Sequence, residues 1–168
     1  MQRRSFLKLG IGSAVVLGVA GGAVALMQPG FAAGKLSTGA RQVMAAVGQA
    51  VLAGTLPADA ATRAASVEAL LGRIDTLVNN SPTHVQDEIS QLLGLLSVGL
   101  GRRTLAGLGP DWQEASTAEV SACLQSMRVS SVRLRQQAYQ GLHELVCAAY
   151  FSGKESWAVL DYPGPLAL

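Results

Sequence analysis

The sequence has 168 residues, of which 49% are hydrophobic and 14% are charged. This balance excludes an intrinsically disordered chain, because so much apolar surface has to be buried, and the length suits one domain. Aromatic residues amount to 5%, and the many small or unbranched side chains favour helix over strand. Two cysteines and two histidines exclude a zinc ribbon, an iron–sulfur site and a disulfide scaffold.

Residues 1–33 have the three parts of an export signal. A basic head is followed by an uncharged run over residues 9–27 and then by small residues. Two adjacent arginines ahead of Phe-Leu-Lys are typical of the signals that the twin-arginine translocase reads. The residues that carry this pattern are Arg3, Arg4, Phe6, Leu7 and Lys8. An ordinary membrane anchor is the alternative, because nineteen residues just cross the ~30 Å hydrocarbon core of a bilayer.

Two fates of this leader stay open. Gly30-Phe31-Ala32 and Ala23-Val24-Ala25 both place small residues at the spacing that cleavage requires. A leader that stays attached would instead hold the protein at the inner membrane. The basic balance belongs to the leader in either case, because without it the formal net charge falls from +2 to −1. The remainder has no basic run, and binding of nucleic acid is not expected.

Residues 34–152 predict a single helical domain. Apolar side chains recur there at three- and four-residue spacing, over residues 35–52, 60–78, 82–100, 117–127 and 132–151. The expected fold class is all-α, a small bundle of about five helices with an extended C-terminal tail, preceded by the export signal.

The helix boundaries follow from capping residues. Asp59, Ser81 and Ser116 are the expected N-caps, and Ser116 forms a capping box with Glu119. Residues 101–112 predict a loop, because glycines and a proline lie close together there.

Residues 153–168 depart from the helical pattern and form a candidate docking tail. Two prolines near its end remove backbone donors and prevent a helix. Aromatic residues gather in the tail and just before it, so it is suited to fill a groove on a partner. The alternative is that these aromatic side chains fold back onto the bundle. The candidate partner-binding residues are Tyr139, Tyr150, Phe151, Trp157, Tyr162, Pro163, Gly164 and Pro165.

The sequence offers no set of catalytic residues and no metal site. No G-x-S-x-G elbow accompanies His84 and His143, so a catalytic triad is not expected. Cys123 and Cys147 lie in the last two long helices and would form a disulfide if those helices pack antiparallel in an oxidising compartment. The alternative is that each is a small core residue. The short basic pairs at 102–103 and 133–135 are either solvated charges or contacts for an acidic partner.

Several segments together resemble the gluconate 2-dehydrogenase subunit 3 family, the small subunits of periplasmic flavin dehydrogenases. Besides the leader they are an L-S-x-x-x-R-x-x-x-A segment from Leu36 to Ala45, Ala138-Tyr139 with Leu142, Ala148 to Trp157, and Tyr162 to Pro165. The resemblance covers most of the chain, and its most specific part is the last thirty residues.

The resemblance implies a non-catalytic subunit without a cofactor of its own. Its partner would be an FAD-dependent large subunit of the glucose–methanol–choline oxidoreductase (GMC) type that oxidises sugars or alcohols. The small subunit would escort this enzyme, folded, through the twin-arginine translocase to the periplasm and would help it mature. A cytochrome c is a further candidate partner, as the electron acceptor. The alternative function is a stand-alone exported helical module that binds a small apolar ligand between its helices.

Overall fold

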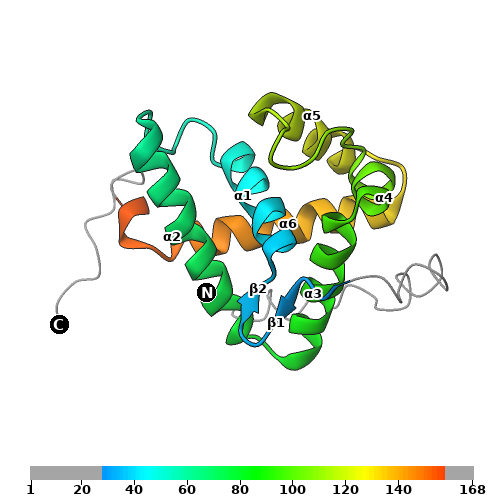
Figure 1. The fold of residues 1–168 in the computed structure, drawn as a ribbon, viewed down its shortest axis with the longest axis horizontal. Helices are drawn as coiled ribbons and strands as arrows, with labels where there is room; N and C mark the ends of the chain where they lie inside the picture. Colours follow the sequence, from blue (N-terminus) through cyan, green and yellow to red (C-terminus); the bar gives the residue numbers. More distant parts are fainter. Residues whose placement is uncertain (1–27, 158–168) are drawn as a thin grey trace.

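The computed structural model describes residues 28–157, and within them the protein is an all-α bundle with one short hairpin, as the sequence predicts (Figure 1). The predicted export-signal residues 3–8 and the tail from residue 158 onwards lie outside the described residues. In chain order the elements are β1 (Phe31–Ala32), β2 (Lys35–Leu36), α1 (Thr38–Val51), α2 (Ala60–Asn79), α3 (Thr83–Ser97), α4 (Gly99–Gly101), η4 (Arg102–Ala106), α5 (Thr117–Arg128), α6 (Arg133–Phe151) and η5 (Lys154–Ser156).

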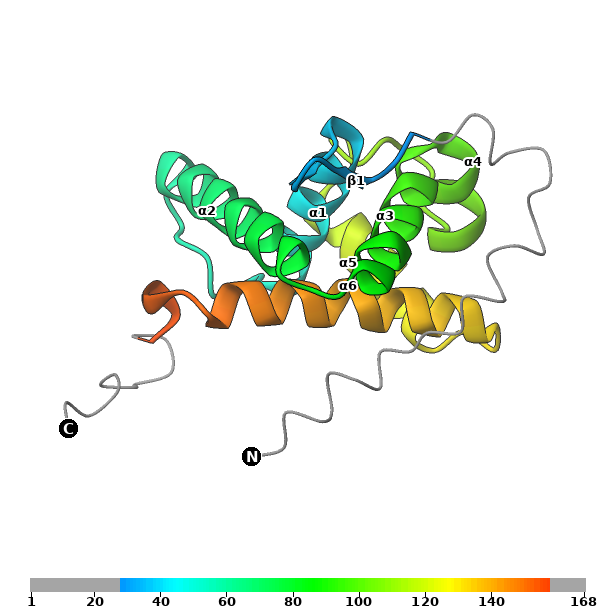
Figure 2. The same ribbon diagram turned by 90° about the horizontal axis from the view of Figure 1, so that it is seen from below.

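Helix α1 is the centre of the bundle. It packs against α2, α3, α5 and α6, and its side chains Val43, Met44 and Val47 are fully buried. The long helix α6 runs lengthwise along the bundle, and α1, α2 and α3 all lie on one side of it (Figure 2). The three-and-four spacing of apolar residues thus builds one continuous core, as amphipathic helices require.

Two of the three predicted caps are confirmed. Asp59 accepts a hydrogen bond from the Thr62 backbone N–H at 2.8 Å, and Ser116 and Glu119 form the predicted capping box. The prediction for Ser81 is wrong, because Pro82 occupies the N-cap position of α3. The Ser81 hydroxyl instead donates to the Leu77 carbonyl at 2.9 Å, which satisfies an acceptor in the last turn of α2.

The predicted loop at 101–112 is partly helical, which corrects the sequence-based boundary. Helix α4 continues into η4, a turn of π-helix. The Arg102 carbonyl accepts hydrogen bonds from the backbone N–H groups of Gly107 and Leu108, at 2.9 and 3.2 Å. Gly107 ends the turn with a φ of 83°, a conformation that glycine adopts readily. Leu105 and Leu108 are buried in the core. Their burial keeps this stretch helical, although its glycines predict a loop.

The folded domain begins before residue 34, where the sequence analysis places its start. Strands β1 and β2 pair as an antiparallel hairpin, with Phe31 opposite Leu36. Both side chains belong to the core, with exposed fractions of 7% and 5%. The last residues of the predicted export segment are therefore part of the bundle.

Replacing Ser116 with alanine is expected to lower the free energy of unfolding by about 1 kcal/mol, because the cap of α5 is lost. Hydrogen bonds from Ser116 hold the pKa of the Glu119 carboxyl below its ordinary value, so the same variant should raise that pKa. Urea unfolding and an NMR titration measure the two effects. Ser121→Ala, at an exposed position of the same helix, is the control. An equal decrease in the free energy of unfolding in Ser116→Ala and Ser121→Ala would contradict the capping role of Ser116.

Candidate partner-docking surface

The end of α6 brings two neighbouring aromatic residues into different environments. Phe151 is 41% exposed, whereas Tyr150 is 6% exposed and belongs to the core. The two rings meet edge to face, with their centroids 5.2 Å apart. The Tyr150 hydroxyl donates to the Thr55 carbonyl at 3.5 Å. Tyr150 is therefore a residue of the bundle itself, which corrects its assignment as a partner-binding residue, while Phe151 is available at the surface.

The C-terminal end of α6 is fixed to α2. The Nε of Arg73 donates to the Ala149 carbonyl at 2.8 Å, and a guanidinium at a helix C-terminus also interacts favourably with the helix dipole. The chain then turns through η5, where the fully buried Ser156 donates from its hydroxyl to the Gly153 carbonyl at 2.7 Å. The described chain is thus held in place as far as the turn that follows α6.

Trp157 lies at the start of the tail and is half-buried. The Lys154 ammonium lies 6.0 Å from the centroid of its ring, at the outer limit of a cation–π interaction. Tyr162, Pro163, Gly164 and Pro165 lie outside the described residues. Of the candidate partner-binding residues in the tail, Trp157 is therefore the one that the structure places.

Tyr139 lies on α6 but far from the aromatic residues at its end. Twelve residues separate it from Phe151, which corresponds to about 18 Å along the helix axis. Its ring packs against His143, with the centroids 5.6 Å apart, and the His143 ring nitrogens lie 3.8 Å from the Cys147 sulfur. The structure does not bring Tyr139 and Phe151 into one docking surface.

The two cysteines are free thiols and are not paired. The buried Cys123 thiol donates to the Ala106 carbonyl at 3.3 Å. The Cys123 sulfur on α5 and the Arg135 guanidinium on α6 bond to the same Ala106 carbonyl, and Cys147 follows Arg135 by twelve residues, about 18 Å along the axis of α6. This helix register separates the thiols. Burial raises the pKa of both thiols, and the neighbouring Glu144 raises that of Cys147 further.

Two arginines of the short basic pairs have structural partners. Arg102 is 6% exposed, pairs with Asp111 and donates to the Gly109 carbonyl at 3.3 Å. Arg135 donates to the carbonyls of Leu105 and Ala106, at 2.9 and 3.0 Å. Both guanidinium groups therefore hold the segment around η4 in place, and neither is a solvated surface charge, which is one of the two interpretations that the sequence leaves open.

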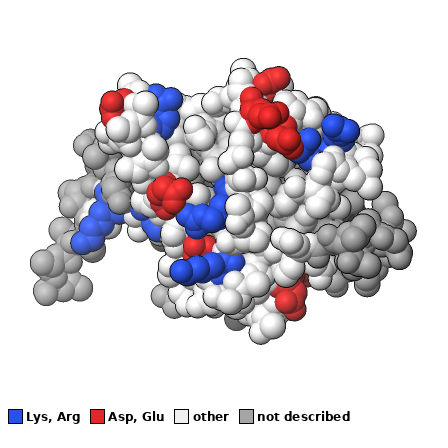
Figure 3. All heavy atoms as spheres, in the orientation of Figure 1, with Lys and Arg blue, Asp and Glu red and all other residues white. Residues whose placement is uncertain are grey.

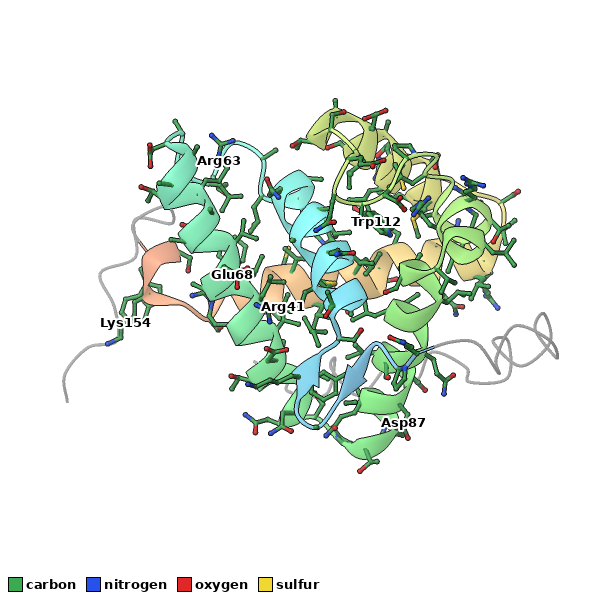
Figure 4. The ribbon with its side chains drawn as sticks, viewed as in Figure 1. Arg41, Arg63, Glu68, Asp87, Trp112 and Lys154 are labelled. Carbon is green, nitrogen blue, oxygen red and sulfur yellow. The ribbon has the colours of Figure 1, made fainter. Side chains whose placement is uncertain are left out.

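A groove of about 550 Å³, which the sequence analysis does not predict, crosses the outer face of α1. In Figure 4, the side chains of Arg41 and Glu68 lie on one side of α1, and that of Trp112 lies on the other side. Glutamines 42, 49 and 113 also line the groove, so its wall is largely polar. Its residues come from three separate segments and share no spacing pattern, which is why the sequence gives no signal for it.

The Arg41 side chain in the groove is paired with two carboxylates. The Arg41 guanidinium bonds to the Glu68 carboxylate at 2.7 Å and to the Asp75 carboxylate at 3.3 Å. The second Asp75 oxygen accepts from the Leu36 backbone N–H at 2.7 Å. This network joins α1, α2 and the hairpin. On the face shown in Figure 3, charges of both signs are scattered over a mostly uncharged surface, without an extended area of one sign.

No family model matches the chain, and neither a curated protein nor a solved structure is found to be similar to it. Over residues 28–157, no helix is both long enough and apolar enough to cross a membrane. In the same part of the chain, no three histidine, cysteine or acidic side chains are grouped as ligands for a metal ion.

Proposed function

We propose that this chain is a non-catalytic small subunit that escorts a GMC-type, FAD-dependent sugar or alcohol dehydrogenase to the periplasm and stabilises it there. The chain supplies the twin-arginine leader and a helical body that binds the large subunit. FAD and the reacting groups belong to the partner, and a cytochrome c is the candidate electron acceptor.

The observation that carries this proposal is the combination of paired arginines at positions 3 and 4 with a small helical domain that presents Phe151 at its surface. The twin-arginine route transports folded proteins, together with any partner already bound. A passenger carrying FAD explains why a chain of this size uses that route. The resemblance of the leader and the last thirty residues to dehydrogenase small subunits points to the same role.

Phe151 is the side chain best placed to anchor the partner. It is a large apolar group at the surface, it lies on the rigid end of α6, and the Arg73 contact holds that end in place. Burying an aromatic ring in a pocket of a partner contributes about 2 kcal/mol or more to binding. The half-buried Trp157 and the tail behind it would extend the same contact.

Purification of the tagged full chain from the periplasm of its native host tests the proposal. We expect a large subunit to co-purify and to give the visible absorption of a bound flavin, with dehydrogenase activity in the same fraction. If the chain is recovered from the periplasm without a bound flavoprotein, the escort function is contradicted.

Replacing Phe151 with serine is expected to weaken binding to that large subunit about thirtyfold, the equivalent of ~2 kcal/mol. Deleting residues 153–168 should weaken it as well. Val129→Ser is the matched control, because Val129 is 66% exposed and lies at the end of α5, before α6 begins at Arg133, which is about 27 Å along the helix axis from Phe151. Pull-down titrations measure the three affinities. Unchanged binding by Phe151→Ser would remove the end of α6 from the interface.

The groove across α1 favours a second candidate function, that of a stand-alone exported ligand-binding module. Its volume of about 550 Å³ suits a small molecule. The glutamine side chains and the Arg41–Glu68 ion pair suit a polar ligand better than the apolar ligand that the sequence analysis considers. This function predicts a monomer in the periplasm that retains a small polar molecule, which the same purification and mass spectrometry would detect.

A further inference from the structure

We propose that one end of the bundle, formed by α4, η4 and the connection from α5 to α6, binds the surface of an anionic phospholipid bilayer. We call this surface the basic end, and its exposed residues are Leu100, Arg103, Arg128, Val129, Val132 and Arg133. The inference goes beyond the escort function and does not depend on it, because contact with lipid is measured on the purified chain.

Three segments that are distant in the sequence meet at the basic end. The Arg135 guanidinium, in the first turn of α6, donates to the Leu105 and Ala106 carbonyls of η4. It also donates to the Ser126 hydroxyl of α5 at 3.0 Å. Figures 1 and 2 both show α4 and the connection between α5 and α6 at the same end of the bundle, where they extend to a similar level. A flat surface laid against this end therefore meets both segments.

The segments that form the basic end carry arginines and no acidic residue. Residues 98–110 contain two arginines and residues 120–143 contain three, and neither stretch contains aspartate or glutamate. Arg103 and Arg133 are exposed, and among the residues that the structure describes neither side chain has an ion-pair or hydrogen-bond partner. Arg128 is exposed as well and bonds to an uncharged side chain of its own helix. These three positive charges are therefore available to anionic groups outside the chain.

Large apolar side chains are exposed in the same segments as these arginines. Leu100, Val129 and Val132 are 67%, 66% and 53% exposed. Of the four large apolar side chains that are exposed in the described part of the chain, three thus lie at the basic end. Basic residues next to exposed apolar side chains are typical of surfaces that enter the headgroup region of an anionic membrane.

The kind of apolar residue favours lipid over an acidic protein as the occupant. Anchors of protein interfaces are enriched in tryptophan and tyrosine, whereas leucine and valine are under-represented among them. The exposed apolar residues of the basic end are one leucine and two valines. The exposed aromatic Phe151 lies at the opposite end of α6. The two ends of the bundle therefore suit different surfaces, a protein pocket at Phe151 and lipid at the basic end.

The described chain begins next to α4. A Cβ added to Gly94 would lie 2.7 Å from the Gln28 carbonyl oxygen, so the chain enters the bundle beside the last turn of α3, just before α4. Residues 1–27 are joined to the bundle at this point. A leader that stays attached in the membrane would therefore bring the basic end close to the lipid headgroups.

Binding of the full chain to vesicles tests the proposal. The double variant Arg103→Gln with Arg133→Gln removes two unpaired charges from the basic end. Lys35→Gln with Lys154→Gln is the matched control, because it removes two exposed positive charges elsewhere and gives the same net charge. The vesicles contain phosphatidylglycerol and phosphatidylcholine in equal parts, and the leader is the same in all three proteins.

We expect the basic-end variant to bind these vesicles about twenty-five-fold more weakly than the natural chain, because each arginine near an anionic surface raises binding about fivefold. The control variant should bind nearly as the natural chain does. On vesicles of phosphatidylcholine alone, the three proteins should bind alike. An equal loss in the two variants, or no loss in the basic-end variant, would overturn the proposal.

Hydrogen exchange separates this contact from any contribution of the leader. On the anionic vesicles, the backbone amides of residues 99–101 and 131–134 should exchange more slowly than in solution, whereas on phosphatidylcholine vesicles they should not. Unchanged exchange on the anionic vesicles would overturn the proposal. Normal vesicle binding by the Arg103 and Arg133 variant, with loss of the large subunit in a pull-down, would instead assign the basic end to an acidic protein. A chain that does not bind lipid would leave the escort function standing.

Discussion

Replacing Trp112 with alanine is expected to lower the free energy of unfolding by about 3–5 kcal/mol, the typical cost of removing a large aromatic side chain from a core. Trp112 is 4% exposed, and its indole N–H donates to the Leu96 carbonyl at 2.8 Å. That carbonyl lies in the last turn of α3, where the helix offers it no partner. The indole therefore fills space in the core and also supplies a hydrogen-bond donor to a carbonyl at the C-terminal end of α3. Urea unfolding followed by circular dichroism measures the loss.

Two controls separate these contributions. Trp112→Phe keeps most of the apolar volume but leaves the buried Leu96 carbonyl without its donor, so we expect a smaller loss of about 1–3 kcal/mol. Trp157→Phe changes the half-buried tryptophan and should leave stability nearly unchanged. A loss below about 1 kcal/mol for Trp112→Ala would contradict the role that the structure gives this residue.

Replacing Arg3 and Arg4 together with lysine is expected to reduce the protein in the periplasm to background. The double variant keeps the charge of the leader and changes only the side-chain geometry, since lysine lacks the planar fork of donors that a guanidinium presents. A translocase that reads the arginine pair as an address would therefore fail to recognise it. Immunoblots of the cytoplasmic and periplasmic fractions measure the outcome.

The matched control makes the same change on the body of the protein. Arg128 and Arg133 are exposed, and their joint replacement by lysine should leave export unchanged. Normal periplasmic levels in the Arg3 and Arg4 variant would show that the leader is not read as a twin-arginine signal. The escort proposal would then lose its main support, whereas the fold and the stability predictions for Trp112 would be unaffected.

The sequence predicts the helices well because their signals are local. Repeated apolar spacing places the long helices, and the caps at Asp59 and Ser116 fix where two of them begin. The prediction fails where a local signal competes with burial. Gly107, Gly109 and Pro110 predict a loop over residues 101–112, but the first part of this stretch is held helical by its buried side chains. Ser81 resembles a cap, yet its hydroxyl bonds backwards to α2.

The candidate docking surface depends more strongly on tertiary structure. Tyr150 and Phe151 are adjacent aromatic residues, and composition alone cannot distinguish them. The helix turns about 100° between them, so one ring enters the core and the other faces outwards. For the same reason the sequence cannot predict the groove, whose residues come from three segments. Nor can it show that Cys123 on α5 and Cys147 on α6 remain unpaired.

The sequence by itself determined the helical class, the main helix positions and the expectation of an export leader, because hydrophobic period, capping residues and paired arginines are local properties of the chain. Only the tertiary structure decided that the domain begins before residue 34, that Phe31 is a core residue, and that Phe151 is at the surface while Tyr150 is buried. These outcomes depend on contacts between residues up to 95 positions apart in the chain. Such contacts form only when the helices pack, and no local pattern encodes them.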